Sequence, residues 1–558
     1  MNNLELLYSH LTKLRSYDDA AKLFTSFLNY EYTAQDISIK RFPNSLDGKI
    51  KQIKILATHD DFKILHCEVD QLLLGIERPI INNLLKDHPY SLFLFSDSSK
   101  NTWHFINVKY DEEETRRKLF RRIVVGPDER LHTAAQRIAM LEVPDQKNAP
   151  LDLQQLHDKA FDVEAVTKEF FKSFAQMFHE VRAEIENLNP GRRAGAAEHA
   201  QVILNRLMFL YFNQKKGWLD NQANYLYERF RKGFKDQPEK HNYYTDVVLR
   251  VSQRLAIADL QFKDLGKIPF LNGGLFEIGD WEPSLKLTNG LFGKLFKDLF
   301  EHYNFTVRED TAMDMEVAID PEMLGKVFEN LILLQEKDPT TDLRKATGSY
   351  YTPRVIVHFM SEQSLKEYLI ENIYYPEGFG LRKDVLPFTN SAYEKSSKQV
   401  TLDDPQQDVL KKQIREKIEK LFTLNPAGQL TEDEITWLKN AFTIEEAQRL
   451  KTLILNCRVC DPAVGSGAFV VGMLHVMVAI IKLLDVRLKG MEEIRTRNYD
   501  YELKRKIIER CLYGVDIQEQ AVKICELRLW LSLVVDYDAT GGEVPPLPNL
   551  SYRIRQGN

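Results

Sequence analysis

The sequence predicts a multidomain α/β protein: a small N-terminal α/β domain, a helical middle domain and a second α/β domain at the C-terminal end. Three observations support this fold class. The chain has 558 residues, whereas a single hydrophobic core stops growing at roughly 250 to 300 residues. Short β-rich runs cluster in residues 53–125. A strand, a glycine loop and a helix follow one another near residue 461, after a long stretch of helical periodicity.

The composition is that of a globular protein without a strong electrostatic bias. Hydrophobic residues make up 44% of the chain and charged residues 28%, with a net charge of −6 and a pI near 6.2. Any contact with nucleic acid must therefore use a local basic face.

The sequence also bears on the compartment. The N-terminal residues lack the pattern of a signal peptide, and the richest apolar run, residues 468–484, is interrupted by His475 and Lys482. Five cysteines in so long a chain do not form a disulfide framework. We therefore expect no membrane span and a cytoplasmic location.

The N-terminal α/β domain is expected to cover residues 1–145. Its predicted strands are the runs IKILA, FKILHCEV, YSLFLFS, WHFINVKY and RRIVV, which polar clusters separate. Leucines at helical spacing, Leu4, Leu7, Leu11 and Leu14, predict a helix that packs on this sheet. The polar stretch VPDQKNAP, with two prolines, predicts the boundary.

Helical periodicity dominates the middle domain, residues 151–345. Ile203, Leu207, Leu210 and Tyr211 share one face of a long predicted helix. The third domain, residues 346–558, is expected to begin with a helix over 355–373. A charged insertion or lid through 390–407 and further helices should follow it.

The most specific feature is the glycine loop Asp461-Pro462-Ala463-Val464-Gly465-Ser466-Gly467-Ala468-Phe469. The apolar run LILNCRV before it predicts a strand over 453–460, and VVGMLHVMVAIIKLL after it predicts a helix. Glycines at such a junction let the backbone approach a ligand closely. The spacing matches neither GxxxxGK[ST] nor GxGxxG. The loop therefore predicts a cofactor other than a nucleoside triphosphate or a dinucleotide.

An acidic residue ends the next predicted strand, at Cys511-Leu512-Tyr513-Gly514-Val515-Asp516. A carboxylate at this place accepts hydrogen bonds from ribose hydroxyls. Asp516 lies much farther from the loop than the roughly 20 residues typical of a dinucleotide fold, which again disfavours NAD. The helical pattern IQEQAVKICELRLWLSLVV follows and is expected to cover the sheet.

These residues carry a resemblance to a known family. Residues 461–469 resemble the first motif of gamma-type N6-adenine DNA methyltransferases, residues 514–517 resemble the second, and Gly348-Ser349-Tyr350-Tyr351-Thr352-Pro353 resembles motif X. The strings FLYFNQKKGWL, FLNGGLFE and LGKVFENLI are similar to the helical region of type IIG restriction-modification enzymes and BREX-type phage-defence methyltransferases. The resemblance runs from about residue 163 to the end of the chain.

The resemblance implies an incomplete Rossmann-like domain that binds S-adenosylmethionine. The backbone at Gly465 and Gly467 would pass the methionine part, Asp461 would lie near its amino group, and Asp516 would hold the ribose. Ile517 would pack on the adenine ring, and Thr352 would touch the methionine end. The complete implied set of cofactor-binding residues is Tyr351, Thr352, Asp461, Ala463, Gly465, Gly467, Asp516, Ile517 and Asn558.

The family's catalytic motif, an Asp, Asn or Ser followed by Pro-Pro and an aromatic residue, is absent from the 558 residues. The resemblance thus implies the N-terminal and cofactor-binding portion of a DNA adenine-N6 methyltransferase from a restriction-modification or phage-defence system. No catalytic residue is assigned, and we expect this chain alone to be inactive. Its expected partners are double-stranded DNA and a second polypeptide that supplies the missing catalytic and target-recognition parts.

Two other functions stay open. The chain could be a non-catalytic subunit that binds DNA or a partner protein. Alternatively, the N-terminal domain could be a metal-dependent nuclease, with Asp61, Glu68 and Asp70 as candidate Mg²⁺ ligands. The string CEVD, residues 67–70, departs from the PD-(D/E)xK nuclease pattern, because Asp70 stands where a lysine would help to activate water.

Two further patterns allow a functional and a plain interpretation. The basic residues Arg116, Arg117, Lys118, Arg121, Arg122, Arg130 and Arg137 could follow DNA phosphates or form a solvated helix face. Cys457 and Cys460 form a CxxC pair that could bind zinc, but a second pair is missing, so we expect buried core cysteines.

Overall fold

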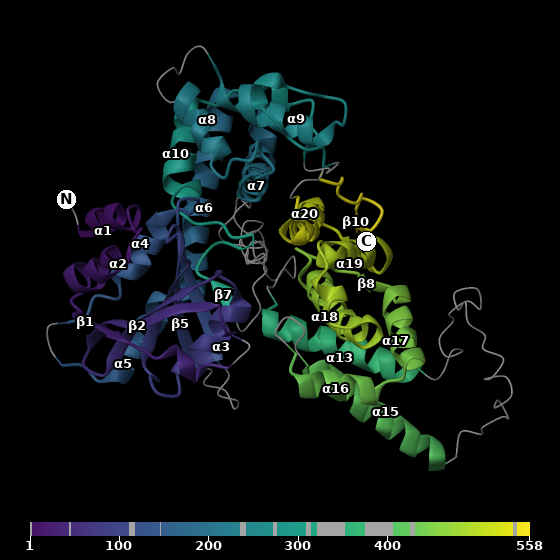
Figure 1. Ribbon diagram of the computed structural model, residues 1–558. Helices are drawn as coiled ribbons and strands as arrows, with labels where there is room; N and C mark the ends of the chain where they lie inside the picture. The colour runs from purple at the N-terminus through teal and green to yellow at the C-terminus, as the bar shows by residue number, and fades with distance from the viewer. Residues whose placement is uncertain are drawn as a thin grey trace, which may run out of the picture. The chain divides into compact units, whose positions relative to one another are not determined.

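The chain divides into two compact units, Met1–Val327 and Phe328–Asn558. Each contains a β-sheet and helices, as expected of a multidomain α/β protein (Figure 1). The computed structural model describes residues 3–43, 46–110, 118–144, 147–234, 241–271, 276–307, 314–320, 352–373, 405–424, 430–539 and 544–557. Most of the predicted charged insertion lies outside these residues. The predicted domain boundaries stay predictions.

A mixed seven-stranded sheet forms the centre of the first unit. Its strands, in order across the sheet, are β1 (Glu31–Asp36), β2 (Ile50–His59), β3 (Phe62–Val69), β4 (Ser91–Ser96), β5 (Trp103–Tyr110), β6 (Lys118–Val125) and β7 (Asp314–Glu316). The pairs β3/β4 and β6/β7 are parallel, and the other pairs are antiparallel. All five predicted runs are strands, whereas β1 and β7 were not predicted.

Helices cover this sheet and bury its apolar residues. Helix α3 (Leu74–Leu84) contributes Ile80 and Ile81 to a core that also contains Phe93 and Phe95. Helix α5 (Pro150–Ala160) lies against β3 and β5. The predicted N-terminal helix is α1 (Asn3–Leu11), which packs on α4 (Leu131–Ala139), and the short α2 (Tyr17–Lys22) follows it.

The middle of the chain is helical, as predicted. Its α-helices are α6 (Val163–Leu188), α7 (Ala196–Lys215), α8 (Tyr225–Gly233), α9 (Arg250–Ala256) and α10 (Asn289–Leu295). Buried Arg206 on α7 donates through Nη2 to Glu282 Oε1 at 3.0 Å, and the hydroxyl of Tyr244 donates to Glu282 Oε2 at 2.6 Å. After these helices the chain returns to the sheet and adds β7 beside β6.

The second unit is built around a three-stranded parallel sheet of order β10-β9-β8. The strands are β8 (Val459–Asp461), β9 (Leu512–Asp516) and β10 (Ile554–Gln556). The helices are α13 (Arg354–Asn372), α15 (Pro405–Thr423), α16 (Glu432–Ala441), α17 (Ile444–Asn456), α18 (Ala468–Lys489), α19 (Tyr499–Arg510) and α20 (Glu519–Asp536). Strand, helix and strand alternate here as the sequence predicts.

The predicted strand over 453–460 is wrong. A capping box between Thr443 and Glu446 starts α17, and the apolar run continues that helix with Leu453 and Ile454 buried on one face. The backbone becomes extended only at Cys457, so β8 is three residues long.

Helix α18 is apolar and lies inside the second unit, where α13, α16, α17 and α19 pack on it. By length and composition it could cross a membrane, but 72% of its most apolar window is buried within the structure. Core helices of soluble proteins pass the same test, so α18 is weak evidence for a membrane span.

Candidate cofactor site at the strand ends of the second unit

The glycine loop folds over the carboxyl end of β9. Strands β8 and β9 are parallel, so their last residues, Asp461 and Asp516, lie at the same edge of the sheet. The N–H of Val464 donates to the carbonyl of Val515 at 2.9 Å. The N–H of Gly465 donates to Oδ2 of Asp516, also at 2.9 Å. The loop and the acidic residue that the sequence singled out are therefore in direct contact.

Both carboxylates keep capacity to accept further hydrogen bonds. Asp516 accepts from Gly465 through Oδ2 and from the Gln518 N–H through Oδ1 at 2.8 Å. Asp461 accepts from the Ala463 N–H through Oδ1 at 3.0 Å. Each carboxylate has about four acceptor positions, so hydroxyl or amino groups of a ligand could still bind. Both residues are partly exposed.

Two glycines shape the loop in different ways. Gly467 has φ +87° and is the N-cap of α18, and a Cβ there would lie 2.6 Å from the Sγ of Cys525. Gly465 has φ +50°, and a Cβ there would meet nothing within 4 Å. The loop is therefore packed tightly at Gly467 and is open at Gly465. The neighbouring side chain of Ile517 is 61% exposed.

Two more residues support the loop: Gly514, whose packing role the sequence pattern did not indicate, and Arg528, which sequence reasoning missed. A Cβ on Gly514 would lie 2.6 Å from Val464 Cγ2, so only glycine lets the loop approach β9 this closely. Arg528 on α20 is 7% exposed, and its Nη1 donates to the carbonyl of Ser466 at 2.9 Å and to the Ser466 hydroxyl at 3.2 Å. The signal for Arg528 was a lone cation in the apolar pattern ELRLWLSL.

Helix α13, which begins two residues after Thr352, packs on α18. A Cβ on Gly472 would lie 2.4 Å from Cγ1 of Val357, so the first turns of α13 and α18 are in close contact. Thr352 lies five residues before Val357, and Gly467 lies five residues before Gly472. Both residues are therefore close in sequence to this helix contact.

The structure thus brings together most of the predicted cofactor-binding residues. Asp461, Ala463, Gly465, Gly467, Asp516 and Ile517 surround the carboxyl ends of β8 and β9. Tyr351 and Asn558 lie outside the described residues. Gly557, directly before Asn558, donates its N–H to the carbonyl of Asp516 at 2.9 Å.

The candidate metal ligands of the first unit are separated or already paired. Glu68 forms an ion pair with Lys100 at 2.7 Å, Asp70 lies 4.0 Å from Lys51, and Asp61 is exposed in the turn before β3. Within the described part of the chain, no group of three or more His, Cys, Asp or Glu side chains could hold a metal ion. This geometry gives the nuclease hypothesis no support.

The basic run near residue 120 does not form a helix face. Residues 118–125 form β6, Arg122 and Arg137 are each 4% exposed, and Arg130 pairs with Glu301 at 2.8 Å. Arg116 and Arg117 lie outside the described residues. The guanidinium groups of Arg122 and Arg137 are therefore core groups and cannot follow DNA phosphates.

The expectation of two buried cysteines in the CxxC pair is also wrong. Cys460 is exposed and Cys457 is partly buried. The physical reason is that β8 is the edge strand of a three-stranded sheet, so one side of it is uncovered.

The chain is similar to two proteins described as type II restriction enzymes and methyltransferases. A putative type II restriction enzyme and methyltransferase of Methanocaldococcus jannaschii is 29% identical over 378 residues, which cover 64% of this chain and 27% of that relative. A type II restriction enzyme and methyltransferase of Escherichia coli is 33% identical over 113 residues, 19% of this chain and 11% of that relative. The chain thus spans about a quarter or less of the length of these relatives.

No family model matches the chain. The type IIL restriction-modification enzyme MmeI, solved in complex with DNA, aligns over 70% of this chain and 40% of its own length, with 14% identity and a TM-score of 0.40.

Proposed function

We propose that the second unit binds S-adenosylmethionine and that the protein serves as a DNA adenine-N6 methyltransferase in a restriction-modification or phage-defence system. The observation that carries the proposal is the hydrogen bond from the Gly465 N–H to the carboxylate of Asp516. It joins a glycine loop and a strand-end carboxylate, the two parts that a nucleoside cofactor needs at the carboxyl edge of a parallel sheet.

The residues present fit this cofactor. The loop has open space at Gly465, where a Cβ would meet no atom within 4 Å. Asp516 is partly exposed and can accept hydrogen bonds from ribose hydroxyls. The exposed Ile517 offers an apolar surface for a purine ring. Asp461 accepts a hydrogen bond from the Ala463 N–H through Oδ1, and its carboxylate can still pair with an ammonium group.

In the proposed function, the bound cofactor would supply a methyl group on a sulfonium, ready for transfer to a nucleophilic amine. Asp516 would orient the ribose, and Asp461 with Thr352 would hold the methionine end. The choice of adenine N6 as acceptor rests on the resemblance of the two motifs and motif X to gamma-type enzymes. A methyltransferase must take the target base out of the DNA helix to reach this amine.

Binding and transfer are tested separately. Calorimetry of the full chain with S-adenosylhomocysteine should show one site, and the Asp516→Ala variant should bind this ligand at least about tenfold more weakly. Glu519→Gln is the matched control, since Glu519 is exposed at the start of α20 and pairs with Lys523. Absence of binding by the unmodified chain, or equal binding by Asp516→Ala, would contradict the proposal.

Methyl transfer needs the catalytic string that these 558 residues do not contain. We therefore propose that the 558 residues alone bind the cofactor without transferring its methyl group to duplex DNA. Transfer of labelled methyl groups to adenine-only and cytosine-only substrates tests this. Labelling of adenine by the chain together with a supplied catalytic segment would support the proposed specificity, and labelling of cytosine would refute it.

A further inference from the structure

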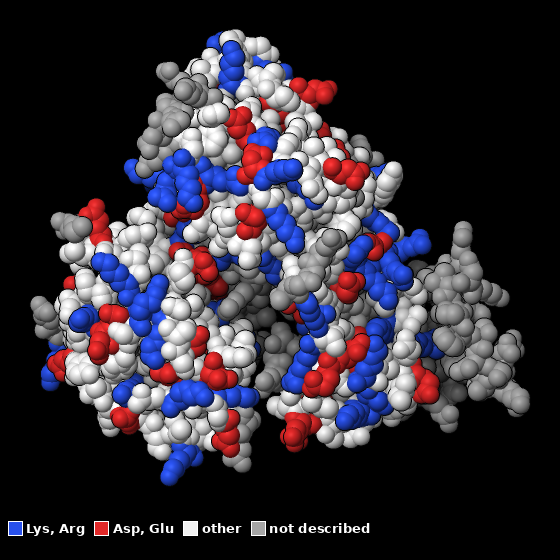
Figure 2. Space-filling view, turned by 45° about the horizontal axis from the view of Figure 1, so that its top comes forward, with Lys and Arg blue, Asp and Glu red and all other residues white. Residues whose placement is uncertain are grey.

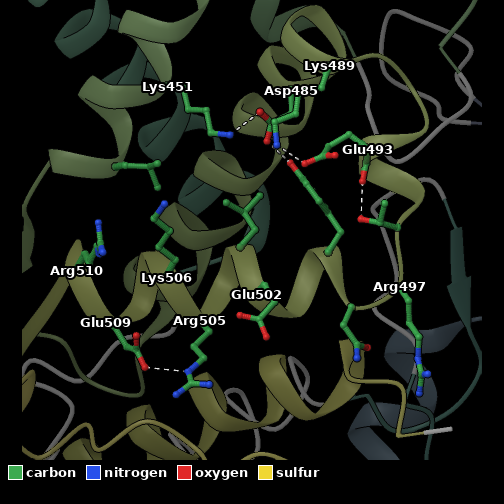
Figure 3. Close-up of a pocket in the computed structure, with 15 residues that line it drawn as sticks. Lys451, Asp485, Lys489, Glu493, Arg497, Glu502, Arg505, Lys506, Glu509 and Arg510 are labelled. Atoms are coloured by element: carbon green, nitrogen blue, oxygen red, sulfur yellow. Dashed lines mark hydrogen bonds and ion pairs between the residues drawn. The ribbon is translucent and has the colours of Figure 1, made fainter. Parts of the chain in front are cut away.

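A cavity lies near the amino ends of the strands, at the opposite end of the sheet from the glycine loop. It has a volume of about 500 Å³ and is lined by residues of α17, α18, α19 and the connection between α18 and α19 (Figure 3). Helix α18 begins at the glycine loop, and its 22 residues extend roughly 33 Å. The cavity is at the far end of α18, so it is separate from the proposed cofactor site.

Positive charge exceeds negative charge around this cavity. Its lining includes six cationic side chains, Lys451, Lys489, Arg497, Arg505, Lys506 and Arg510, and four acidic ones, Asp485, Glu493, Glu502 and Glu509. Three acids are engaged: Asp485 accepts from Lys451 at 2.5 Å, Glu509 accepts from Arg505 at 2.9 Å, and Glu493 pairs with Lys489. The dashed lines in Figure 3 mark these contacts.

Of the other three cations, Arg497 pairs with Asp538 at 3.3 Å, and Lys506 and Arg510 remain. Neither forms an ion pair with any described residue, and both are exposed, one helical turn apart on α19. Partial desolvation lowers the pKa of Lys506, and the neighbouring charges of Arg510 and Lys451 lower it further, against the opposite effect of Asp485. Like charges held this close destabilise the fold slightly. A bound anion would remove that cost.

The positive charge continues along the edge of the sheet. Arg458 directly precedes β8, Arg510 stands two residues before β9, and Arg553 directly precedes β10. Because the three strands are parallel and adjacent, these arginines all lie at the amino ends of the strands, and neighbouring strands are about 4.8 Å apart. Nη1 of Arg553 donates to the carbonyl of Arg510 at 3.4 Å, so these two arginines lie close together although β10 begins opposite Gly514, two residues into β9.

The arrangement is local. Figure 2 shows Lys, Arg, Asp and Glu interspersed over the visible face, without one large field of a single sign. The net charge of the chain is −6. The C-terminal end of α19 favours one nearby cation through its dipole, which does not account for Arg458, Lys506, Arg510 and Arg553 together.

We propose that this edge binds the phosphates of a nucleic-acid backbone. Lys506 and Arg510 hold one phosphate at the mouth of the cavity, and Arg458 and Arg553 contact neighbouring phosphates. A row of cations favours a polyanion over a single small anion, because each DNA strand carries a phosphate about every 3.4 Å along its axis. The proposal is independent of the cofactor site and would stand if that site bound another molecule.

The test is the salt dependence of duplex DNA binding by the full chain, measured by fluorescence anisotropy between 50 and 200 mM salt. Each lost phosphate contact should reduce the slope of log K against log salt by about 0.9. The double variant Lys506→Gln/Arg510→Gln should therefore lose roughly 0.9 in slope, because the two side chains hold one phosphate between them. Arg458→Gln/Arg553→Gln should change the slope in the same direction.

The matched control is Arg231→Gln/Lys232→Gln. It removes one arginine and one lysine from α8, where both pair with Glu228, and should leave the slope unchanged. Unchanged thermal unfolding of the variants separates binding from folding. The proposal is overturned if the unmodified chain does not bind DNA at 50 mM salt, or if both double variants keep the original slope. Tight binding of pyrophosphate with no binding of DNA would also overturn it, since the site would then serve a free anion.

Discussion

The N–H of Gly465 donates a 2.9 Å hydrogen bond to Oδ2 of Asp516, across 51 residues of sequence. Together with the hydrogen bond from the Val464 N–H to the carbonyl of Val515, this contact holds the glycine loop against the carboxyl end of β9. The position of the loop and the orientation of the carboxylate therefore depend on each other.

Replacement of Asp516 should weaken cofactor binding strongly. Hydrogen bonds to a charged group contribute roughly 1.5 to 3 kcal/mol each, so Asp516→Ala should reduce the affinity for S-adenosylhomocysteine by about 10- to 100-fold or more. Asp516→Asn should give an intermediate loss, because its amide nitrogen cannot accept a hydrogen bond from Gly465 or Gln518. Calorimetry of both variants, with Glu519→Gln beside them, checks the order.

The two loop glycines should respond differently to alanine. Gly465→Ala should cost only about 1 to 2 kcal/mol of stability, since a positive φ strains alanine but its Cβ has room. It should nevertheless impair cofactor binding, because the methyl group projects into the open space. Gly467→Ala should destabilise more, and Cys525→Ala should partly rescue it by removing the sulfur that the new Cβ meets. Chemical unfolding and calorimetry separate these effects; equal behaviour of the two glycines would argue against this account.

Arg528 should affect both stability and binding. Arg528→Met leaves the carbonyl of Ser466 without its donor, which costs roughly 1 to 3 kcal/mol for a buried group, and loosens the loop. Lys504→Met is the matched control, because Lys504 is also buried in the second unit but pairs with Asp536 at 2.8 Å, away from the loop. Both variants should unfold at lower temperature, while only Arg528→Met should bind S-adenosylhomocysteine more weakly.

Acid should destabilise the first unit through two buried histidines. Burial lowers the pKa of His66 to about 4 and that of His157 to about 3, whereas an unfolded histidine has a pKa near 6.5. The unfolded state therefore takes up protons first as the pH falls below about 6.5, and stability declines by up to roughly 1.4 kcal/mol per pH unit for each histidine.

Urea unfolding at pH 7, 6 and 5 measures this decline. His157→Gln should reduce the pH dependence of the free energy of unfolding, although this variant also loses the 2.9 Å contact of His157 Nε2 with the Tyr30 hydroxyl. His179→Gln, at an exposed position on α6, is the control. If the free energy of unfolding of His157→Gln falls with pH as steeply as that of the unmodified chain, other groups cause the acid sensitivity.

The sequence was informative where local patterns decide the structure. The runs that became β2 to β6 combine β-branched and aromatic residues, and each lies in a buried sheet. Strand β1 was missed because its residues, EYTAQD, are polar and exposed on almost every position. Strand β7 has three residues and exists only because the chain returns to β6 after the helical region.

For the apolar run before the glycine loop, the sequence predicted a strand where the structure has the end of helix α17. Periodicity alone cannot distinguish a short strand from a buried helix end. The deciding signal was the pair Thr443 and Glu446, whose spacing of three is that of a capping box and starts α17.

The candidate site was predictable in part. The glycine loop and Asp516 follow from residue types and spacing. The supporting roles of Gly514, Cys525 and Arg528 could not be predicted this way, because they rest on contacts that depend on the register of β9 and the packing of α20. The roles of the site residues stay predictions until a cofactor is bound.

The close approach of α13 to α18 makes the packing of the second unit sensitive to substitution at a single helix position, Gly472. A Cβ there would lie 2.4 Å from Cγ1 of Val357, so any larger residue would force the Val357 side chain or the crossing of the two helices to shift. Sequence variation at position 472 would therefore change the helix crossing while leaving every residue of the glycine loop as it is.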